Sequence, residues 1–391
     1  MNYILFDGDV RNALLPFTYT KPVADIRIGI LTIREKWEKF LGVTTTTITE
    51  EYLEEKYPMV EMEVNVLLNA SFLPSKTLVE MVKNLEPNQA IFKEEDVIAF
   101  YTTDTQEEVD FSQYEQIEFV EELIQIKNTW DIFSLNDKAI KVDFELITEG
   151  RKSQPIPDTV NCINRDDIFI EEGATITFAT LNASTGPIYI GKNALIMEGC
   201  LVRGPLAMCE ESALKMGAKI YGATTLGPHC KVGGEVNNAV LFGYTNKGHE
   251  GYLGNSVLGE WCNLGADTNN SNLKNNYAEV RLWNYETGRF AKTGLQFCGL
   301  MMGDHSKCGI NTMFNTGTVV GVSANIFGSG FPRNFIPSFS WGGASGFTEY
   351  KTDKVFEVAE VVMKRRGIEF DEVEKKILDH VFTETQKYRN Y

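Results

Sequence analysis

The sequence predicts three parts: an α/β N-terminal domain (residues 1–150), a left-handed parallel β-helix of hexapeptide repeats (residues 160–345), and a helical tail (residues 348–391). Three observations lead to this prediction. Strand-like and helix-like runs alternate at the start of the chain. Aliphatic residues recur at every sixth position in the middle, and apolar residues recur at helical spacing near the end.

The first part shows the alternation of an α/β domain. A polar stretch with two prolines, residues 151–158, follows it and predicts a linker. Residues 130–150 predict a helix and then a connecting strand. The other expected strands are Tyr3–Phe6, Val64–Leu68, Ala90–Phe92 and Val97–Phe100, and the expected helices lie near Thr32–Phe40 and Ser75–Lys83.

The middle part has an apolar period of six, which fits neither a helix nor a strand. Each hexad can form one flat face of a triangular prism, with its large residue inside. Such a prism buries its core only when coils stack. The pattern resumes from Met302 to Ile326, after a predicted hairpin around Glu286-Thr287-Gly288. The unbroken run is Ile190, Ile196, Val202, Met208, Leu214, Ile220, Leu226 and Val232.

Charge and composition narrow the possible partners. Residues 1–150 carry 29 acidic and 13 basic side chains, so they account for nearly all of the chain's net charge of −17. This negative charge disfavours nucleic acid as a partner. No stretch approaches the roughly 20 apolar residues of a membrane span. The chain starts with a strand rather than a signal segment, so we expect a cytoplasmic protein without membrane insertion. The seven cysteines and four histidines are scattered, so no metal site is expected.

The most informative local sequence is residues 246–266, N-K-G-H-E-G-Y-L-G-N-S-V-L-G-E-W-C-N-L-G-A. It resembles the acetyltransferase half of the bifunctional glucosamine-1-phosphate acetyltransferase / N-acetylglucosamine-1-phosphate uridyltransferase family. That family carries H-x-x-Y-[LV]-G-D followed by I-G-x-x-x-N-[IL]-G-A-G-T. Asn255 replaces the aspartate of this motif, and Asp267 replaces its second glycine.

Acetyl transfer accounts for the residue types in the motif. An amine that attacks a thioester must lose a proton, and histidine, with a reference pKa of about 6.5, is a suitable base near neutral pH. The resemblance implies that His249 is the general base and that Asn272 orients the amine. The residues implied for the sugar and its phosphate are Tyr252, Asn263, Lys247 and Lys274.

The resemblance also implies acetyl-CoA as co-substrate and a homotrimer with active sites between subunits. The pantetheine arm would lie along an edge of the prism, near backbone amides of later coils. Either Lys219 or Lys231 could match a basic residue that the family carries upstream of the motif. The candidates for the acetyl-CoA contact, by position, are Gly309, Ile310 and Gly321.

Residues 6–22, F-D-G-D-V-R-N-A-L-L-P-F-T-Y-T-K-P, resemble the opening of sugar-phosphate nucleotidyltransferases, L-A-G-G-x-G-T-R-L-x-P-L-T-x-T-x-P-K. The glycine-rich phosphate loop is reduced to one glycine between two aspartates, which would repel a triphosphate. Asn69-Ala70-Ser71 stands where that family carries a magnesium-binding aspartate. Magnesium is therefore expected only if this nucleotidyltransferase-like domain is active. The candidate nucleotide-binding residues are Gly8, Arg11 and Lys21.

Together these features predict an acetyl-CoA-dependent N-acetyltransferase for an amino-sugar phosphate, with glucosamine 1-phosphate as the expected acceptor. Two alternatives remain. One is a bifunctional enzyme whose first domain still transfers a nucleotide, which binding of UTP or dTTP with magnesium would favour. The other is a non-catalytic assembly module that binds sugar nucleotides, which the absence of any transfer would favour.

Overall fold

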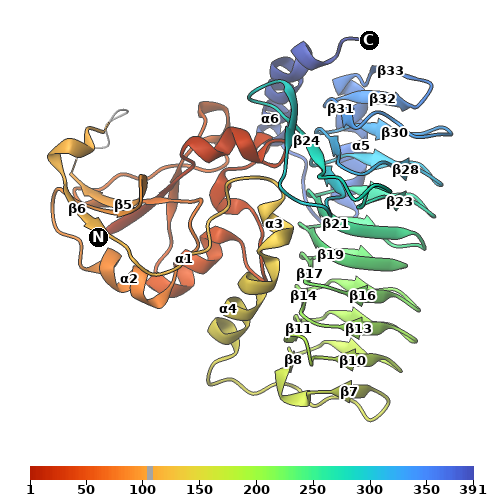
Figure 1. Cartoon of the computed structure of the whole chain (residues 1–391), viewed down its shortest axis with the longest axis horizontal. Coiled ribbons are helices and arrows are strands. Elements are labelled where there is room, and N and C mark those ends of the chain that lie inside the picture. The colour runs from red at the N-terminus through yellow and green to blue at the C-terminus, as the bar shows by residue number, and fades with distance from the viewer. Residues whose placement is uncertain (104–108) are drawn as a thin grey trace.

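The computed structural model describes residues 1–103 and 109–391 (Figure 1). A six-stranded mixed sheet forms the centre of the N-terminal domain, in the order β2-β1-β3-β5-β4-β6. β1 is parallel to β2 and β3, and β5 is antiparallel to β3 and β4. The four strands expected from the sequence are confirmed as β1, β3, β4 and β5. The strands are β1 (Asn2–Phe6), β2 (Thr46–Ile48), β3 (Asn65–Asn69), β4 (Gln89–Lys93), β5 (Asp96–Thr102) and β6 (Glu115–Glu118).

The helices of this domain have recognisable ends. Thr32 and Glu35 form a capping box at the start of α1, and Gly42 ends it with a left-handed φ of 78°. The strand expected after Trp130 is wrong, because Asn136, Ala139, Ile140 and Asp143 are buried along one side of a helix. The helices are α1 (Ile33–Leu41), α2 (Lys76–Lys83), α3 (Asp131–Ser134) and α4 (Asn136–Thr148).

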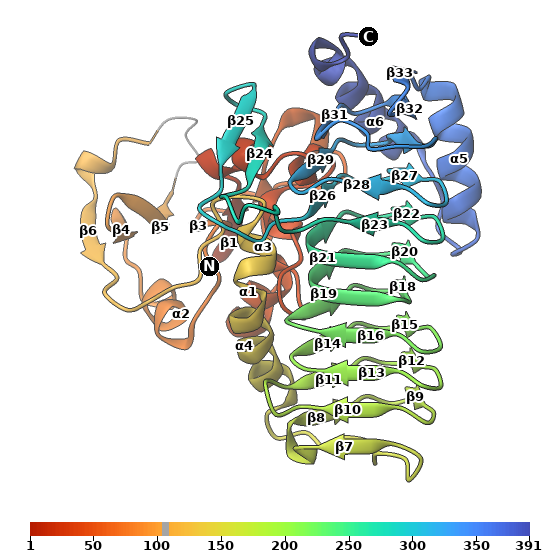
Figure 2. The ribbon, with the colours of Figure 1, turned by 45° about the vertical axis from the view of Figure 1, so that its right-hand side comes forward.

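The middle of the chain is a parallel β-helix of stacked coils, as the hexads predict (Figure 2). All eight residues of the unbroken hexad run point into the prism and are at most 3% exposed. The prism has three faces, which we name the open, the docked and the third face. The open face consists of β7 (Asn161–Ile163), β10 (Thr180–Asn182), β13 (Leu201–Arg203), β16 (Lys219–Tyr221), the first halves of β19 (Glu235–Leu241) and β21 (Tyr252–Leu258), β23 (Asn269–Asn270) and β28 (Met313–Phe314).

The other two faces are equally regular. The docked face consists of β8 (Ile168–Ile170), β11 (Ile188–Ile190), β14 (Leu206–Met208), β17 (Thr224–Leu226), the second halves of β19 and β21, β26 (Leu300–Met302), β29 (Thr318–Val320) and β31 (Phe335–Ile336). The third face consists of β9 (Thr175–Ile176), β12 (Leu195–Ile196), β15 (Ala213–Leu214), β18 (Lys231–Val232), β20 (Asn246–Lys247), β22 (Asn263–Leu264), β27 (Lys307–Cys308), β30 (Asn325–Ile326) and β32 (Ser340–Gly343), which pairs with β33 (Gly346–Glu349).

The predicted hairpin and the two tail helices are also confirmed. β24 (Arg281–Asn284) pairs antiparallel with β25 (Arg289–Lys292) in an insertion after β23. The tail forms α5 (Thr352–Lys364) and α6 (Glu372–Glu384). α6 returns to the N-terminal domain, where Glu374 pairs with Lys56 at 2.6 Å. The imidazole of His380 stacks on Tyr52 with ring centroids 3.8 Å apart.

Two large apolar cores account for most of the buried apolar residues, beside two smaller clusters. One fills the interior of the prism. The other contains the core of the N-terminal domain, the outward residues of the docked face (Val240, Phe242, Val257, Met301 and Val319 among them) and α5 and α6. The N-terminal domain therefore lies along the side of the prism, as both views show (Figures 1 and 2). No helix in the described residues has the length and apolarity to cross a bilayer.

Candidate functional site

The motif that predicts acetyl transfer, residues 246–266, forms about one coil of the prism. His249 lies in the turn between β20 and β21, where the chain passes from the third face to the open face. We call the row of such turns the site edge. The turn rests on Gly234 of the coil below, where a Cβ would lie 2.8 Å from the His249 carbonyl oxygen. The imidazole side chain is exposed to solvent.

Tyr252 and Asn272 come together beside this turn. The Asn272 side-chain amide donates to the Tyr252 hydroxyl at 2.9 Å and to Asn255 Oδ1 at 2.8 Å. A Cβ at Gly254 would collide with both the Tyr252 hydroxyl and the Asn272 amide, so glycine is required between the strands here. Asn255, where the resembling family has aspartate, thus orients Asn272.

The two lysines predicted to meet a phosphate have other partners. Lys247 is 2% exposed and donates to the His249 carbonyl oxygen at 2.7 Å, inside the turn. Lys274 donates to the carbonyl oxygen of Glu279 at 2.9 Å. Asn263 is exposed on the third face, in register with Asn246 and Lys307. It lies on a different face from Tyr252.

The residues predicted to meet acetyl-CoA divide between two edges. Gly309 and Ile310 lie on the site edge, in the turn between β27 and β28, and Ile310 is 70% exposed. Gly321 lies between β29 and β30, at the edge between the docked and third faces. The amides of Gly309 and Gly321 already donate to Ile326 and Ile336, each at 2.8 Å. Ile310 therefore offers exposed surface to a ligand, whereas the two glycine amides serve the stacking of the coils.

Lys219 is one of the two lysines considered as the basic residue upstream of the motif. It lies on the open face in register with Glu235, which is in register with Tyr252 on the next strand. Its ammonium lies 3.5 Å from Glu250. Lys231 lies on the third face, where the ammonium is close enough to Arg365 and Arg366 for their charges to lower its pKa further after burial. The two lysines thus lie on different faces of the prism.

The N-terminal domain has a cleft of about 510 Å³ at the carboxyl ends of β1 and β3. Ligands commonly bind at this end of parallel strands. Gly8 lies in the wall with a φ of 61°, close to Asn69. The described residues that line the cleft include three carboxylates, several aromatic rings and no lysine or arginine. They are Phe6, Gly8, Asp9, Val10, Ile48, Leu67, Asn69, Phe92, Glu95, Asp96, Val97, Phe100, Val109, Phe111 and Gln125.

The two cations predicted for a nucleotide do not line this cleft. Arg11 is buried, donates to the Tyr52 hydroxyl at 2.7 Å and lies 3.3 Å from Glu50. Lys21 is 2% exposed and lies between Asp304 and Glu260 of the prism, at 2.8 and 3.0 Å. The sequence prediction did not take these carboxylates into account, and Asp304 lies 283 residues from Lys21 along the chain. No group of three or more histidine, cysteine or acidic side chains gathers in the described residues to hold a metal ion.

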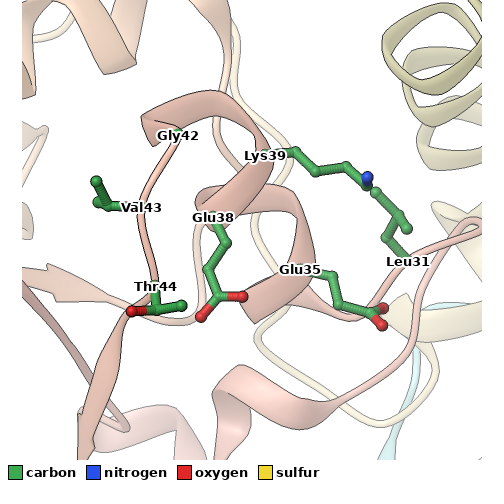
Figure 3. Close-up of a pocket in the computed structure, with 7 residues that line it drawn as sticks. All are labelled: Leu31, Glu35, Glu38, Lys39, Gly42, Val43 and Thr44. Carbon is green, nitrogen blue, oxygen red and sulfur yellow. The ribbon is translucent and has the colours of Figure 1, made fainter.

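A second, shallower pocket of about 520 Å³ lies around α1 (Figure 3). Its acidic side chains have structural partners. Glu35 caps α1, and Glu38 accepts from the backbone N–H of Thr45 at 2.8 Å. We assign no chemistry to this pocket.

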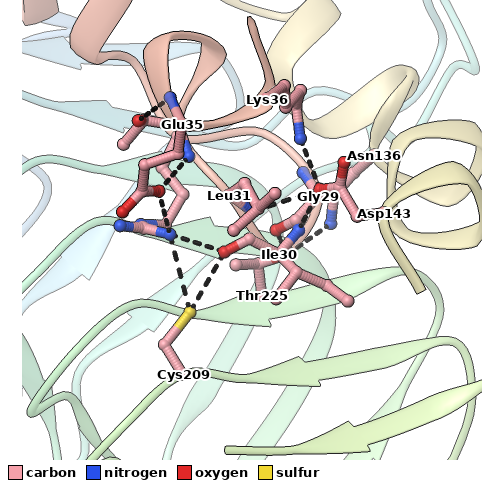
Figure 4. A network of polar contacts seen from close by, with 11 residues as sticks. Gly29, Ile30, Leu31, Glu35, Lys36, Asn136, Asp143, Cys209 and Thr225 are labelled. Carbon is pink, nitrogen blue, oxygen red and sulfur yellow. Dashed lines mark hydrogen bonds and ion pairs between the residues drawn. The ribbon is translucent and has the colours of Figure 1, made fainter. Parts of the chain in front are cut away.

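A buried polar network fastens the N-terminal domain to the docked face (Figure 4). Asp143 accepts from the backbone N–H groups of Ile30 and Leu31 and pairs with Lys36. Asn136 accepts from the N–H of Gly29 at 2.7 Å, and Thr225 of the prism donates to the Gly29 carbonyl oxygen at 2.8 Å. The loop before α1 is thus held between α4 and the prism.

Comparison with known proteins agrees with this architecture. Residues 3–152 match the family model described as sugar nucleotidyl transferase. The bifunctional protein GlmU of Synechococcus elongatus is 23% identical over 227 residues, which cover 52% of this chain and 46% of that protein. GlmU of Methanocaldococcus jannaschii is 30% identical over 118 residues, covering 30% of this chain and 26% of that protein. The chain thus matches sugar nucleotidyl transferases in its first part and is similar to GlmU proteins over part of its length, and it spans less than half the length of these curated relatives.

Two solved structures are also similar. The polySia-specific acetyltransferase NeuO is 11% identical, with 53% of this chain and 91% of that chain covered and a TM-score of 0.25. The UDP-N-acetylglucosamine acyltransferase of Francisella novicida is 12% identical, with 57% and 87% covered and a TM-score of 0.26.

Proposed function

We propose that this GlmU-like protein is a cytoplasmic, acetyl-CoA-dependent N-acetyltransferase for an amino-sugar phosphate. Glucosamine 1-phosphate is the acceptor we propose. The observation that carries the proposal is the turn at residues 248–251. It holds an exposed histidine beside the hydrogen-bonded pair of Tyr252 and Asn272, within a sequence motif that resembles an acetyltransferase site.

The proposed reaction needs one base and one means of orienting the amine. The sugar amine attacks the thioester carbonyl carbon, the carbon–sulfur bond breaks, and the thiolate of coenzyme A leaves. His249 takes the proton that the attacking nitrogen loses and returns it to the sulfur. The side-chain Oδ1 of Asn272 accepts a hydrogen bond from the amine, because the side-chain NH2 of Asn272 already donates to Tyr252 and Asn255. Fixing the amine in this way lowers the entropic part of the barrier.

We propose Lys219 as the residue that binds the phosphate of the sugar. Lys219 lies on the open face in the same row as Tyr252, with Glu235 between them. A phosphate dianion would compete with Glu250 for the Lys219 ammonium. Acetyl-CoA would lie along the site edge and contact Ile310. The edge is continuous there, since the amide of Asp267 donates to Glu250 and that of Asn311 donates to Ala266.

We further propose a homotrimer. Within one chain Asn263 lies on the third face and Tyr252 on the open face, so one subunit does not bring both to one ligand. A neighbouring prism packed on the open face would add its own third-face residues to the site. Sedimentation of the intact chain tests this part separately.

Thiol release from acetyl-CoA tests the central proposal. We expect release that requires glucosamine 1-phosphate and falls at least about 100-fold in His249→Ala, as for loss of a general base. His380→Ala, an exposed histidine in α6, is the matched control. Release that is equal in wild type and His249→Ala would contradict the mechanism, and no release with any amino sugar would favour the non-catalytic alternative.

The bifunctional alternative is supported by the match of residues 3–152 to sugar nucleotidyl transferases. The lining of the cleft argues against this alternative. Asp9 and Glu95 line the cleft, and no cationic side chain among the described residues pairs with them there. We assign no magnesium ligand there and derive no step through a metal. Calorimetric titration with UTP and magnesium decides this alternative, and we expect no saturable heat.

A further inference from the structure

One lysine occupies an interior position of the prism. On the third face, Lys247 lies in register with Val232 of the coil below and Leu264 of the coil above. Both of these neighbours are at most 2% exposed and belong to the apolar core of the prism. Lys247 is equally buried, so its four-carbon stem replaces an aliphatic side chain at this level.

The ammonium of Lys247 satisfies a carbonyl that the coils leave free. Three of the carbonyl oxygens in the turn at residues 248–251 belong to His249, Glu250 and Gly251. Backbone N–H groups of adjacent coils reach two of them: Asp267 donates to Glu250 at 3.0 Å and Glu235 donates to Gly251 at 3.1 Å. The third oxygen, at His249, accepts from Lys247 Nζ at 2.7 Å.

This arrangement is unfavourable for the stability of the prism. Burial lowers the pKa of Lys247 to about 8, which shows that the charged form is poorly solvated there. An aliphatic side chain would fill the same volume without that penalty. The benefit of a lysine at this level therefore lies in the turn that it holds.

We infer that Lys247 is a positioning residue, which fixes the backbone of His249 from inside the prism and thereby aims the imidazole at the open face. The inference rests on the proposed function of His249. Lys247 does not contact substrate, and its effect passes through the His249 carbonyl. Without this bond, the hydrogen bonds that the described residues donate to these three carbonyl oxygens are those at Glu250 and Gly251, so His249 can rotate away from Tyr252 and Asn272.

The test is Lys247→Met, which keeps the length of the stem and removes the ammonium. We expect kcat to fall about tenfold or more, because small displacements of a reacting group are costly. We expect the KM for acetyl-CoA to stay within about twofold. The unfolding midpoint should be equal to or above that of wild type. Leu264→Met is the matched control for repacking of the next coil and should leave kcat within about twofold.

Amide hydrogen exchange of residues 246–252 provides a readout that needs no activity. We expect faster exchange in Lys247→Met than in wild type, and no change in Leu264→Met. Wild-type kcat with unchanged exchange in Lys247→Met would overturn the inference, as would parallel losses of stability and activity. If wild type itself shows no transfer, the proposed function fails, and the exchange experiment still decides whether Lys247 holds the turn.

Discussion

The contact between Lys21 and the prism gives the sharpest prediction of stability. Lys21→Met removes an ammonium that lies 2.8 Å from Asp304 and 3.0 Å from Glu260. The Lys21 and Asp304 side chains are only 3% and 4% exposed, whereas Glu260 is 34% exposed. Burial disfavours the Lys21 charge, but the two carboxylates outweigh it and raise its pKa. Lys21 is therefore charged at neutral pH.

The expected loss of unfolding free energy depends on the hydrogen bonds that Asp304 keeps in the variant. Removing one partner of a buried ion pair costs about 3–5 kcal/mol, because the other charge stays buried. Asp304 retains two neutral donors, the Thr20 hydroxyl at 2.7 Å and the Glu260 N–H at 2.8 Å. Glu260 is partly solvated, so its share is at most about 1 kcal/mol. We expect Lys21→Met to lower the free energy of unfolding by about 3 kcal/mol.

Denaturant unfolding followed by tryptophan fluorescence measures this loss. The double variant Lys21→Met/Asp304→Asn removes both charges and should recover most of the stability. Lys141→Met, in an exposed pair with Asp137, is the control and should change stability by less than about 0.5 kcal/mol. A loss below about 1 kcal/mol in Lys21→Met would refute the reasoning. So would a double variant as unstable as the single one.

Three further outcomes are expected. Gly234→Ala should reduce acetyl transfer at least about tenfold in steady-state assays, because its Cβ would press on the His249 and Gly251 carbonyl oxygens and its φ is 72°; unchanged transfer would mean that the turn tolerates displacement. Tyr252→Phe removes one hydrogen bond to Asn272, so kcat/KM for the sugar should fall about threefold to tenfold; no change would remove Tyr252 from the site. Because the Lys247 pKa is about 8 in the folded chain against 10.5 in a free side chain, unfolded chains bind more protons between these values. The stability of wild type relative to Lys247→Met should therefore rise with pH across that window in denaturant titrations, and a constant difference would contradict the burial of Lys247.

Local periodicity predicted the fold well, for a physical reason. Each coil repeats the same burial pattern, so the interior residues from Ile190 to Val232 follow from spacing alone. The error after Trp130 arose at α4, whose buried residues include Asn136 and Asp143. Polar residues buried by a distant partner look like surface residues in a sequence pattern.

The candidate site was predicted only in part, because register across coils is not a local property. The resemblance to a known family indicated His249, Tyr252 and Asn272, which lie close in sequence. It did not indicate that Lys247 points into the prism, since a broken hexad hides which residue is interior. Nor could it reveal the pairing of Lys21 with Asp304, which are 283 residues apart.

The docked face explains a detail of the sequence that the hexads leave aside. Its strands carry apolar residues on both sides, as in Val240-Leu241, Val257-Leu258, Met301-Met302 and Val319-Val320, with one member inside the prism and the other under the N-terminal domain. A chain cut in the linker at residues 151–158 would leave a strip of apolar sheet facing water, which favours aggregation. The two halves are therefore interdependent. Assays on either fragment alone would report on a damaged surface, and point substitutions in the whole chain are the better test of each half.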